Sequence, residues 1–270
     1  MKGLIRWGLI FSLAGGGFVS TSLVRQSAAI AIPEAEAVKR LENIPTFMVT
    51  GEQGEPLLAV VPNPKDKSKK LQLAPFYMSH TDAQNAVTNL KKQKPELGKS
   101  AKVTVFSLKG ALEIAKQNKD KQNELVFQFI PTQEQIDFAM TILKESGQEV
   151  KQFNGVPMFF AVFGEEKEKK PLFIEKDKKS VMPVFFRQQD AQNMVNNFKK
   201  SDQKLGPTAA IQVTSLNNML GFLLKADQTS VQQIEFVPDL DSLQYAVNQQ
   251  KGSGTQPQQP SAAPEKPESK

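Results

Sequence analysis

The sequence repeats itself, and this duplication constrains the fold more than any other feature. The segment DAQNAVTNLKK at residues 82–92 returns as DAQNMVNNFKK at 190–200, an offset of 108. The same offset relates Leu97-Gly98 to Leu205-Gly206. Further matches keep their order on both sides: IPTF at 44–47 with VPMF at 156–159, and FQFIP at 127–131 with IEFVP at 234–238. The chain is therefore a tandem duplication of a unit the size of a small domain.

Hydrophobic periodicity predicts the same order of elements in both units. Ser107 and Ser215 are natural N-caps for the middle helix of each unit, and Thr132 with Gln135 forms a capping-box pattern before the last helix of the first unit. The order is β-β-β-α-β-α-β-α, with a hairpin start followed by crossovers. We expect an α+β (mixed α/β) fold, with a last helix closing each unit and the two repeats packed as one pseudo-two-fold body. The expected strands are 47–49, 57–61, 76–78, 103–106 and 125–130, with 159–163, 172–174, 184–186, 211–213 and 234–237 in the second unit.

The chain divides into six predicted segments. Residues 1–31 resemble a secretory signal peptide, with Lys2 and Arg6 before an apolar run and Ala29-Ile30-Ala31 as the cleavage pattern. The alternative is an uncleaved anchor, because the apolar run approaches the length that crosses a bilayer. We expect export to the periplasm, or to the thylakoid lumen, and no membrane span after cleavage. The remaining segments are a lead-in helix at 32–43, unit 1 at 44–144, a joint at 145–154, unit 2 at 155–250 and a disordered tail at 251–270.

Composition argues against most chemistry. The chain has no Cys and one His, His80, so thiol chemistry is excluded and no metal site is expected. The net charge of +6 would fall to +3 without Lys2, Arg6 and Arg25, and the other basic residues alternate with acidic ones, so we expect no nucleic-acid partner. The repeated Asp82 and Asp190 fit N-cap or helix-dipole roles. We expect a non-enzymatic protein without cofactors; a hydrolase with an unmarked site is the alternative.

Apolar and mainly aromatic side chains are the most abundant candidates for function. Some lie on a strand that is apolar on both faces, and others on a helix that is apolar nearly all round. That helix is either a core helix at the pseudo-two-fold axis or part of a pocket for hydrophobic peptide segments. The candidate polypeptide-binding residues are Phe47, Phe76, Tyr77, Phe159, Phe160, Phe163, Phe185, Phe186, Met219, Phe222 and Leu223.

The duplicated segments at 44–47, 82–92, 156–160 and 190–200 resemble the Tic family, the 22-kilodalton intermembrane-space component of the chloroplast inner-envelope translocon. The signal peptide suggests the cyanobacterial branch. The resemblance implies a pseudo-symmetric fold with apolar pockets and a chaperone-like role in preprotein translocation or outer-membrane biogenesis. It also implies as partners unfolded outer-membrane or precursor proteins and the Omp85-type outer-membrane insertase. A static scaffold or adaptor of a translocon is the alternative.

Overall fold

The computed structural model describes residues 34–63, 66, 68–118, 125–165, 168–226 and 228–253. The predicted signal peptide lies outside the described residues, as does the predicted tail beyond residue 253. Residues 251–253, which the sequence assigned to that tail, instead end a helix.

The first unit is built on a five-stranded sheet. It contains β1 (Pro45–Thr50), β2 (Ala59–Pro62), β3 (Lys70–Tyr77), β4 (Lys102–Ser107) and β5 (Leu125–Ile130). Strand β1 is antiparallel to β3 and β4, β2 forms an antiparallel hairpin with β3, and β5 runs parallel to β3. The hairpin and the parallel crossover therefore belong to one mixed sheet.

The second unit has the corresponding pairings. Its strands are β6 (Pro157–Phe163), β7 (Lys170–Pro171), β8 (Ile174–Lys176), β9 (Lys179–Phe185), β10 (Ala210–Ser215) and β11 (Ile234–Val237). Strand β6 is antiparallel to β9 and β10, and β11 runs parallel to β9. The strand expected at 172–174 is wrong: Leu172 turns into the core and donates its N–H to the Ala161 carbonyl, while Phe173 stays exposed. The bend separates β7 from β8, so that of the predicted strand only Ile174 is in a strand.

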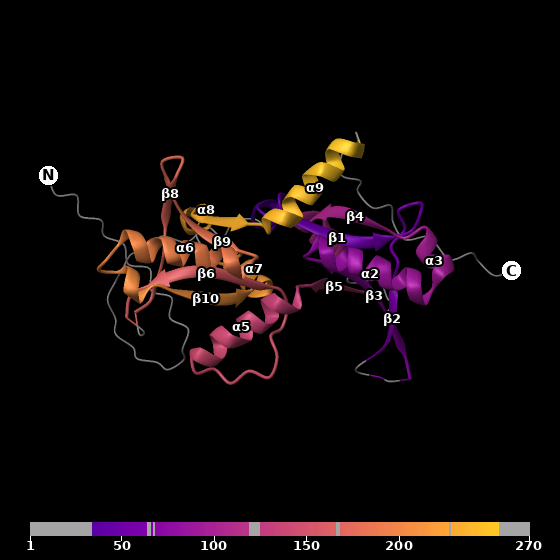
Figure 1. Ribbon diagram of the computed structural model, residues 1–270, viewed down its shortest axis with the longest axis horizontal. Coiled ribbons are helices and arrows are strands. Elements are labelled where there is room, and N and C mark those ends of the chain that lie inside the picture. Colours follow the sequence, from indigo (N-terminus) through magenta and orange to yellow (C-terminus); the bar gives the residue numbers. More distant parts are fainter. Residues whose placement is uncertain are drawn as a thin grey trace.

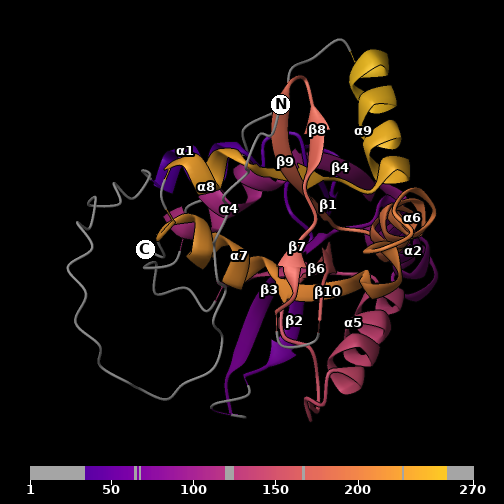
Figure 2. The same cartoon turned by 90° about the vertical axis from the view of Figure 1, so that its left-hand side faces the viewer.

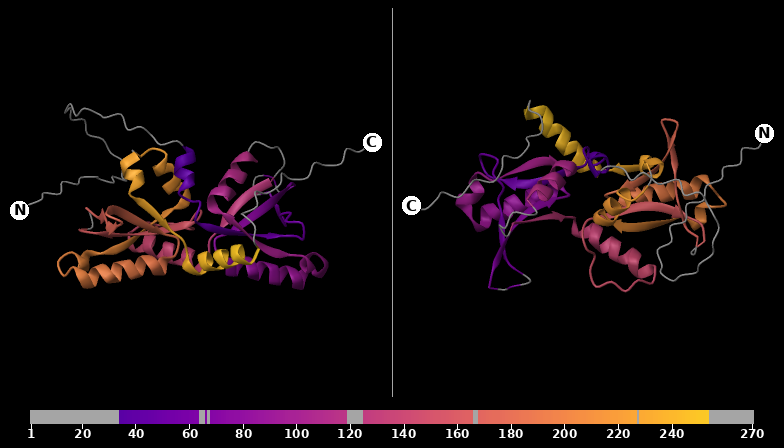
Figure 3. Two further views of the ribbon diagram at one scale, coloured as in Figure 1. Left: turned by 90° about the horizontal axis from the view of Figure 1, so that it is seen from above. Right: turned by 180° about the vertical axis from the view of Figure 1, so that it is seen from behind.

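Helices cover both faces of the two sheets, as Figures 2 and 3 show. One layer holds α2 (His80–Gln93), α5 (Gln133–Glu145), α6 (Gln188–Ser201) and α9 (Leu240–Ser253), and the other holds α1 (Glu34–Lys39), α4 (Leu108–Gln117), α7 (Leu216–Leu223) and α8 (Gln228–Gln232). The predicted N-caps are confirmed, since Ser107 Oγ accepts from Gly110 N and Ser215 Oγ accepts from Asn218 N. The mixed α+β class is confirmed as well.

The last helix of each unit packs on the sheet of the other unit (Figure 1). Helix α5 lies against β6 and β10, and α9 lies against β1 and α2. The ring of Phe138 on α5 meets Phe159 edge-on at 5.6 Å between centroids, and Tyr245 on α9 meets Phe47 in the same way at 5.8 Å. The expectation that each helix closes its own unit is therefore wrong. An amphipathic stripe specifies that a face is buried but not which partner covers it.

A shared core joins the units on the opposite side. Leu41 and Leu108 from the first unit are fully buried in one cluster with Met158, Leu216 and Leu223 from the second. Arg40 adds a hydrogen bond from Nη1 to the carbonyl of Ile234 at 3.1 Å. Helix α7 is thus a core helix near the junction, the simpler of the two interpretations that the sequence allowed.

The repeated Leu-Gly pair has a structural explanation. Short segments, α3 (Pro95–Lys99) and the 3₁₀ turn η1 (Gly206–Thr208), fold back on the ends of α2 and α6. A Cβ added at Gly98 would lie 2.5 Å from the Lys91 Cα, and one at Gly206 would lie 2.7 Å from the Lys199 Cα. Both positions require Gly because backbone meets backbone there.

Candidate functional site: an aromatic face and an inter-unit cleft

The structure buries most of the candidate polypeptide-binding residues. Tyr77, Phe160, Phe163 and Phe222 are half-buried. The remaining seven are core residues: Phe47, Phe76, Phe159, Phe185, Phe186, Met219 and Leu223. The seven core residues can contact another polypeptide only after local opening, so an accessible binding surface is limited to the four half-buried candidates and to residues outside this set. A role for the eleven residues in binding stays a prediction.

Accessible aromatic surface is found on the first sheet, on the face that α4 partly covers. Phe76 is buried at its centre, with Phe106 edge-on at 5.6 Å and Phe127 and Phe129 stacked at 6.2 and 5.6 Å. Phe127, Phe129 and the neighbouring Leu125 are only half-buried. We use the name aromatic face for the set Phe76, Phe106, Leu125, Phe127, Phe129 and Val60.

Strand register places Val60 on that face. Val60 pairs with Gln72, and Gln72 pairs with Leu125. Directly paired residues project to the same side of a sheet, and so do residues two apart along a strand. Val60 is 61% exposed, so this face extends outward along the β2–β3 hairpin, with the exposed side chain of Gln72 between Val60 and Leu125. Phe127, Phe129 and Val60 were not among the residues predicted from the sequence. The alternation Phe127-Gln128-Phe129 does indicate a strand with aromatic side chains on one face.

The second candidate is a cleft of about 300 Å³ between the two units. Helices α2, α5, α6 and α9 all begin at this cleft. We call α5 and α9 the exchanged helices, because each packs on the other unit: α5 lies beside α6, and α9 lies beside α2. Its walls combine apolar and polar groups, which suits a short polar stretch of polypeptide better than a purely apolar one. The lining residues from the first unit include Met78, His80, Thr132 and Gln135, and those from the second include Phe186, Arg187, Asp239 and Asp241.

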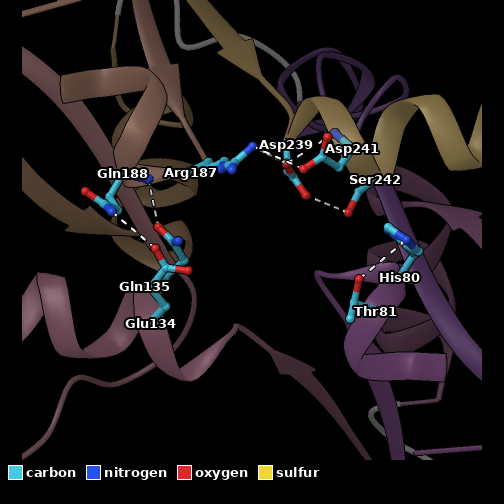
Figure 4. Close-up of polar contacts among 9 residues, drawn as sticks. All are labelled: His80, Thr81, Glu134, Gln135, Arg187, Gln188, Asp239, Asp241 and Ser242. Atoms are coloured by element: carbon cyan, nitrogen blue, oxygen red, sulfur yellow. Dashed lines mark hydrogen bonds and ion pairs between the residues drawn. The ribbon is translucent and has the colours of Figure 1, made fainter. Parts of the chain in front are cut away.

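Polar contacts join the start of α5 to that of α6, and Arg187 before α6 to the start of α9 (Figure 4). The Gln135 Oε1 atom on α5 accepts a hydrogen bond from the backbone N of Gln188 on α6 at 2.7 Å. Arg187, which has no side-chain cap role, contacts Asp241 at 3.3 Å and Asp239 at 3.5 Å. The predicted capping box is half right: Thr132 Oγ1 accepts from Gln135 N, but the Gln135 side chain caps α6 instead. The exchanged helix thus supplies a cap to its neighbour.

The repeated acids lie in the first turns of α2 and α6. Ser79 and Arg187 occupy the N-cap positions, so the dipole role for Asp82 and Asp190 is the one that the structure supports. Burial raises the pKa of Asp82. Burial also raises the pKa of Asp190. The negative charges of Asp239 and Asp241 raise it further, and the positive charge of Arg187 opposes them. The Asp190 Oδ2 atom is buried without a hydrogen-bond partner.

His80 is the first residue of α2, where it lies against the exchanged helix α9. Its ring stacks on Tyr245 at 4.7 Å with an interplanar angle of 13° and meets Phe47 edge-on. Within the described residues, no three His, Cys, Asp or Glu side chains are grouped so as to hold a metal ion. The described helices also include none that is long and apolar enough to cross a membrane.

These features define the class: a two-unit α+β protein with exchanged helices, a mixed cleft between the units and an open aromatic face on the first. The family model described as "Tic22-like family" matches residues 16–249, and the chain belongs to this family.

Relatives agree with this assignment. The chain is similar to the protein "TIC 22-like, chloroplastic" of Arabidopsis thaliana, at 22% identity over 235 residues that cover 86% of this chain and 69% of the relative. The solved structure of Anabaena Tic22, described with protein transport, superposes with a TM-score of 0.68 at 30% identity and covers 80% of this chain and 97% of that one. Tic22 from Plasmodium falciparum shares the fold, with a TM-score of 0.58 at 20% identity, and covers 81% of this chain and 98% of that one. The chain thus belongs to a family that works in protein transport.

Proposed function

We propose that this protein is a chaperone-like transport factor that binds unfolded or hydrophobic segments of polypeptides without enzymatic activity. The observation that carries this proposal is the aromatic face of the first sheet. Phe127 and Phe129 stack on the buried Phe76 and are half accessible, and Val60 extends the same face into solvent. Apolar side chains gathered on an open face are a common mark of an interaction site.

The face has the properties that a varied client requires. Its centre is rigid, because Phe76 is held by three neighbouring rings. Its outer part lies on a hairpin whose β2 strand is largely exposed, so a client segment can reach it without unfolding the sheet. Apolar contact that lacks polar anchor points discriminates weakly between sequences, which suits a factor that handles many clients.

We assign this activity to the periplasm, or to the thylakoid lumen. The predicted signal peptide at 1–31 and the family membership support the assignment. The clients would be precursor or unfolded outer-membrane proteins, and the Omp85-type insertase would be the acceptor. This extends the protein-transport role of the Anabaena relative to the present chain.

The test is suppression of aggregation of a urea-unfolded outer-membrane barrel protein, followed by light scattering without ATP. We expect Val60→Ser to weaken suppression at least threefold, and likewise Leu58→Ser, which changes an exposed apolar residue two positions before Val60, in the segment that leads into β2. Leu205→Ser is the matched control, because Leu58 and Leu205 are 38% and 37% exposed but lie in different units. If the wild-type protein in stoichiometric excess leaves aggregation unchanged, the chaperone proposal is wrong. The scaffold alternative predicts that outcome together with retained binding to folded translocon components.

A further inference from the structure

The two exchanged helices are equivalent in sequence but not in packing. At an offset of 107, Phe138 corresponds to Tyr245 and Ala139 to Ala246. Helix α5 continues its apolar stripe for another turn with Ile142 and Leu143, both partly buried. Helix α9 has Gln249 and Gln250 at those positions, and both are exposed.

The apolar burial of helix α9 therefore lies in its first two turns. Ser242 and Ala246 are buried and Tyr245 is half-buried, whereas residues 247–251 are all exposed. The contacts of Arg187 with Asp239 and Asp241 add only partly exposed ion pairs at its start. Beneath Tyr245 lies Phe47, which is fully buried, beside the ring of His80.

We propose that α9 is a removable cover and that the groove of β1 and α2 beneath it is a docking site for an amphipathic helix of a client polypeptide. The equivalent groove of the second unit, which α5 fills, indicates what kind of helix fits. There α5 places an aromatic ring on Phe159 and adds apolar side chains one turn later, and it packs along more of its length than α9 does. A client helix with an aromatic residue at the place of Tyr245 and an aliphatic one at the place of Gln249 would bury more apolar surface than α9. This inference rests on the proposed function and names a second surface for it.

The cover can be tested by thiol labelling, because the chain has no Cys. Single cysteines replace equivalent buried alanines in the full chain, Ala246→Cys on α9 and Ala139→Cys on α5. We expect the thiol at 246 to react with a maleimide or disulfide reagent at least ten times faster than the thiol at 139 under native conditions. Equal rates would mean that α9 opens only with the whole protein, and the cover would be ruled out.

Docking is tested with a fluorescein-labelled synthetic peptide of residues 132–146, followed by fluorescence anisotropy on the full chain. We expect Tyr245→Ala to tighten peptide binding at least fivefold and the double substitution Gln249→Ile/Gln250→Leu, which restores the α5 stripe, to weaken it at least fivefold. If Tyr245→Ala fails to fold, Asp241→Asn takes its place: it removes one contact of Arg187 with the start of α9 and should also tighten peptide binding. A peptide with Ser at the place of Phe138 is the control and should not bind.

Peptide affinity that none of these substitutions changes would overturn the docking site, even if aggregation is still suppressed. Loss of aggregation suppression with intact, α9-dependent peptide binding would instead count against the proposed function and leave the groove in place.

Discussion

Replacing Phe138 with Ala tests the exchange of helices directly, because the residue belongs to the first unit in sequence and to the second in space. Its ring packs edge-on against the fully buried Phe159, in a cluster with Ala139 and Phe185. Removing roughly 100 Å² of apolar contact at ~25 cal/mol per Å² costs about 2.5 kcal/mol. The lost aromatic contact adds about 0.5–1.5 kcal/mol. We expect the free energy of unfolding to fall by about 3 kcal/mol.

Chemical denaturation measures the magnitude, and hydrogen exchange with mass spectrometry measures the location. The reduction corresponds to a fall in Tm of about 6–12 °C for a protein of this size. Amides of β6 and β10, which α5 covers, should lose protection, whereas those of β1 and β4 should change less. Thr141→Ala on the exposed side of α5 is the control and should alter stability by less than about 0.5 kcal/mol. Loss of protection confined to β1 and β4 would refute the exchange.

Three further predictions follow from single positions. Gly98→Ala forces a Cβ against the Lys91 backbone and should lower the free energy of thermal unfolding by about 1–3 kcal/mol. Gly221→Ala in α7, where a Cβ would meet open space, is the control and should stabilise by about 0.5–1 kcal/mol. Equal effects would contradict the close approach of Gly98 to the Lys91 backbone. Ser215→Ala removes the hydroxyl that accepts from Asn218 N and should lower the free energy of unfolding by about 1 kcal/mol. An unchanged free energy of unfolding would mean that this cap does not stabilise α7. Burial raises the pKa of Asp190 in the folded protein above the ordinary value of an aspartate, 3.8, so the contribution of this group to stability is present below that pH and is lost as the pH rises through the folded pKa. Asp190→Asn should therefore flatten the decline of the denaturation midpoint above pH 4, and an unchanged profile would exclude this group.

Local features of this fold could be predicted because they depend on neighbours in sequence. Ser107 and Ser215 cap their helices as the pattern indicated, since the N-cap contact reaches only three residues ahead. The amphipathic segment at 82–92 lies within α2, and its copy at 190–200 lies within α6. The duplication itself was also evident, because segments matched in the same order at nearly the same offset can be recognised without knowledge of packing.

The candidate site was predicted less well. A strand such as 158–163, apolar on both faces, looks the same in sequence whether helices cover it or a client does. In the structure Phe159 is sealed by α5, whereas Phe127 and Phe129, which flank the polar Gln128, are half-buried. Exposure depends on how far α4 extends over the sheet, and no local pattern records that.

The sequence by itself determined that there are two copies of one unit, where their helices begin and which faces are apolar. Only the tertiary structure decided which sheet each terminal helix covers, that Gln135 caps α6 rather than its own helix, and that a cleft forms where four helices begin. The physical reason is that hydrophobic burial has no preferred direction: the apolar stripe of α5 or α9 can be buried on either sheet, and chain connectivity and shape make the choice.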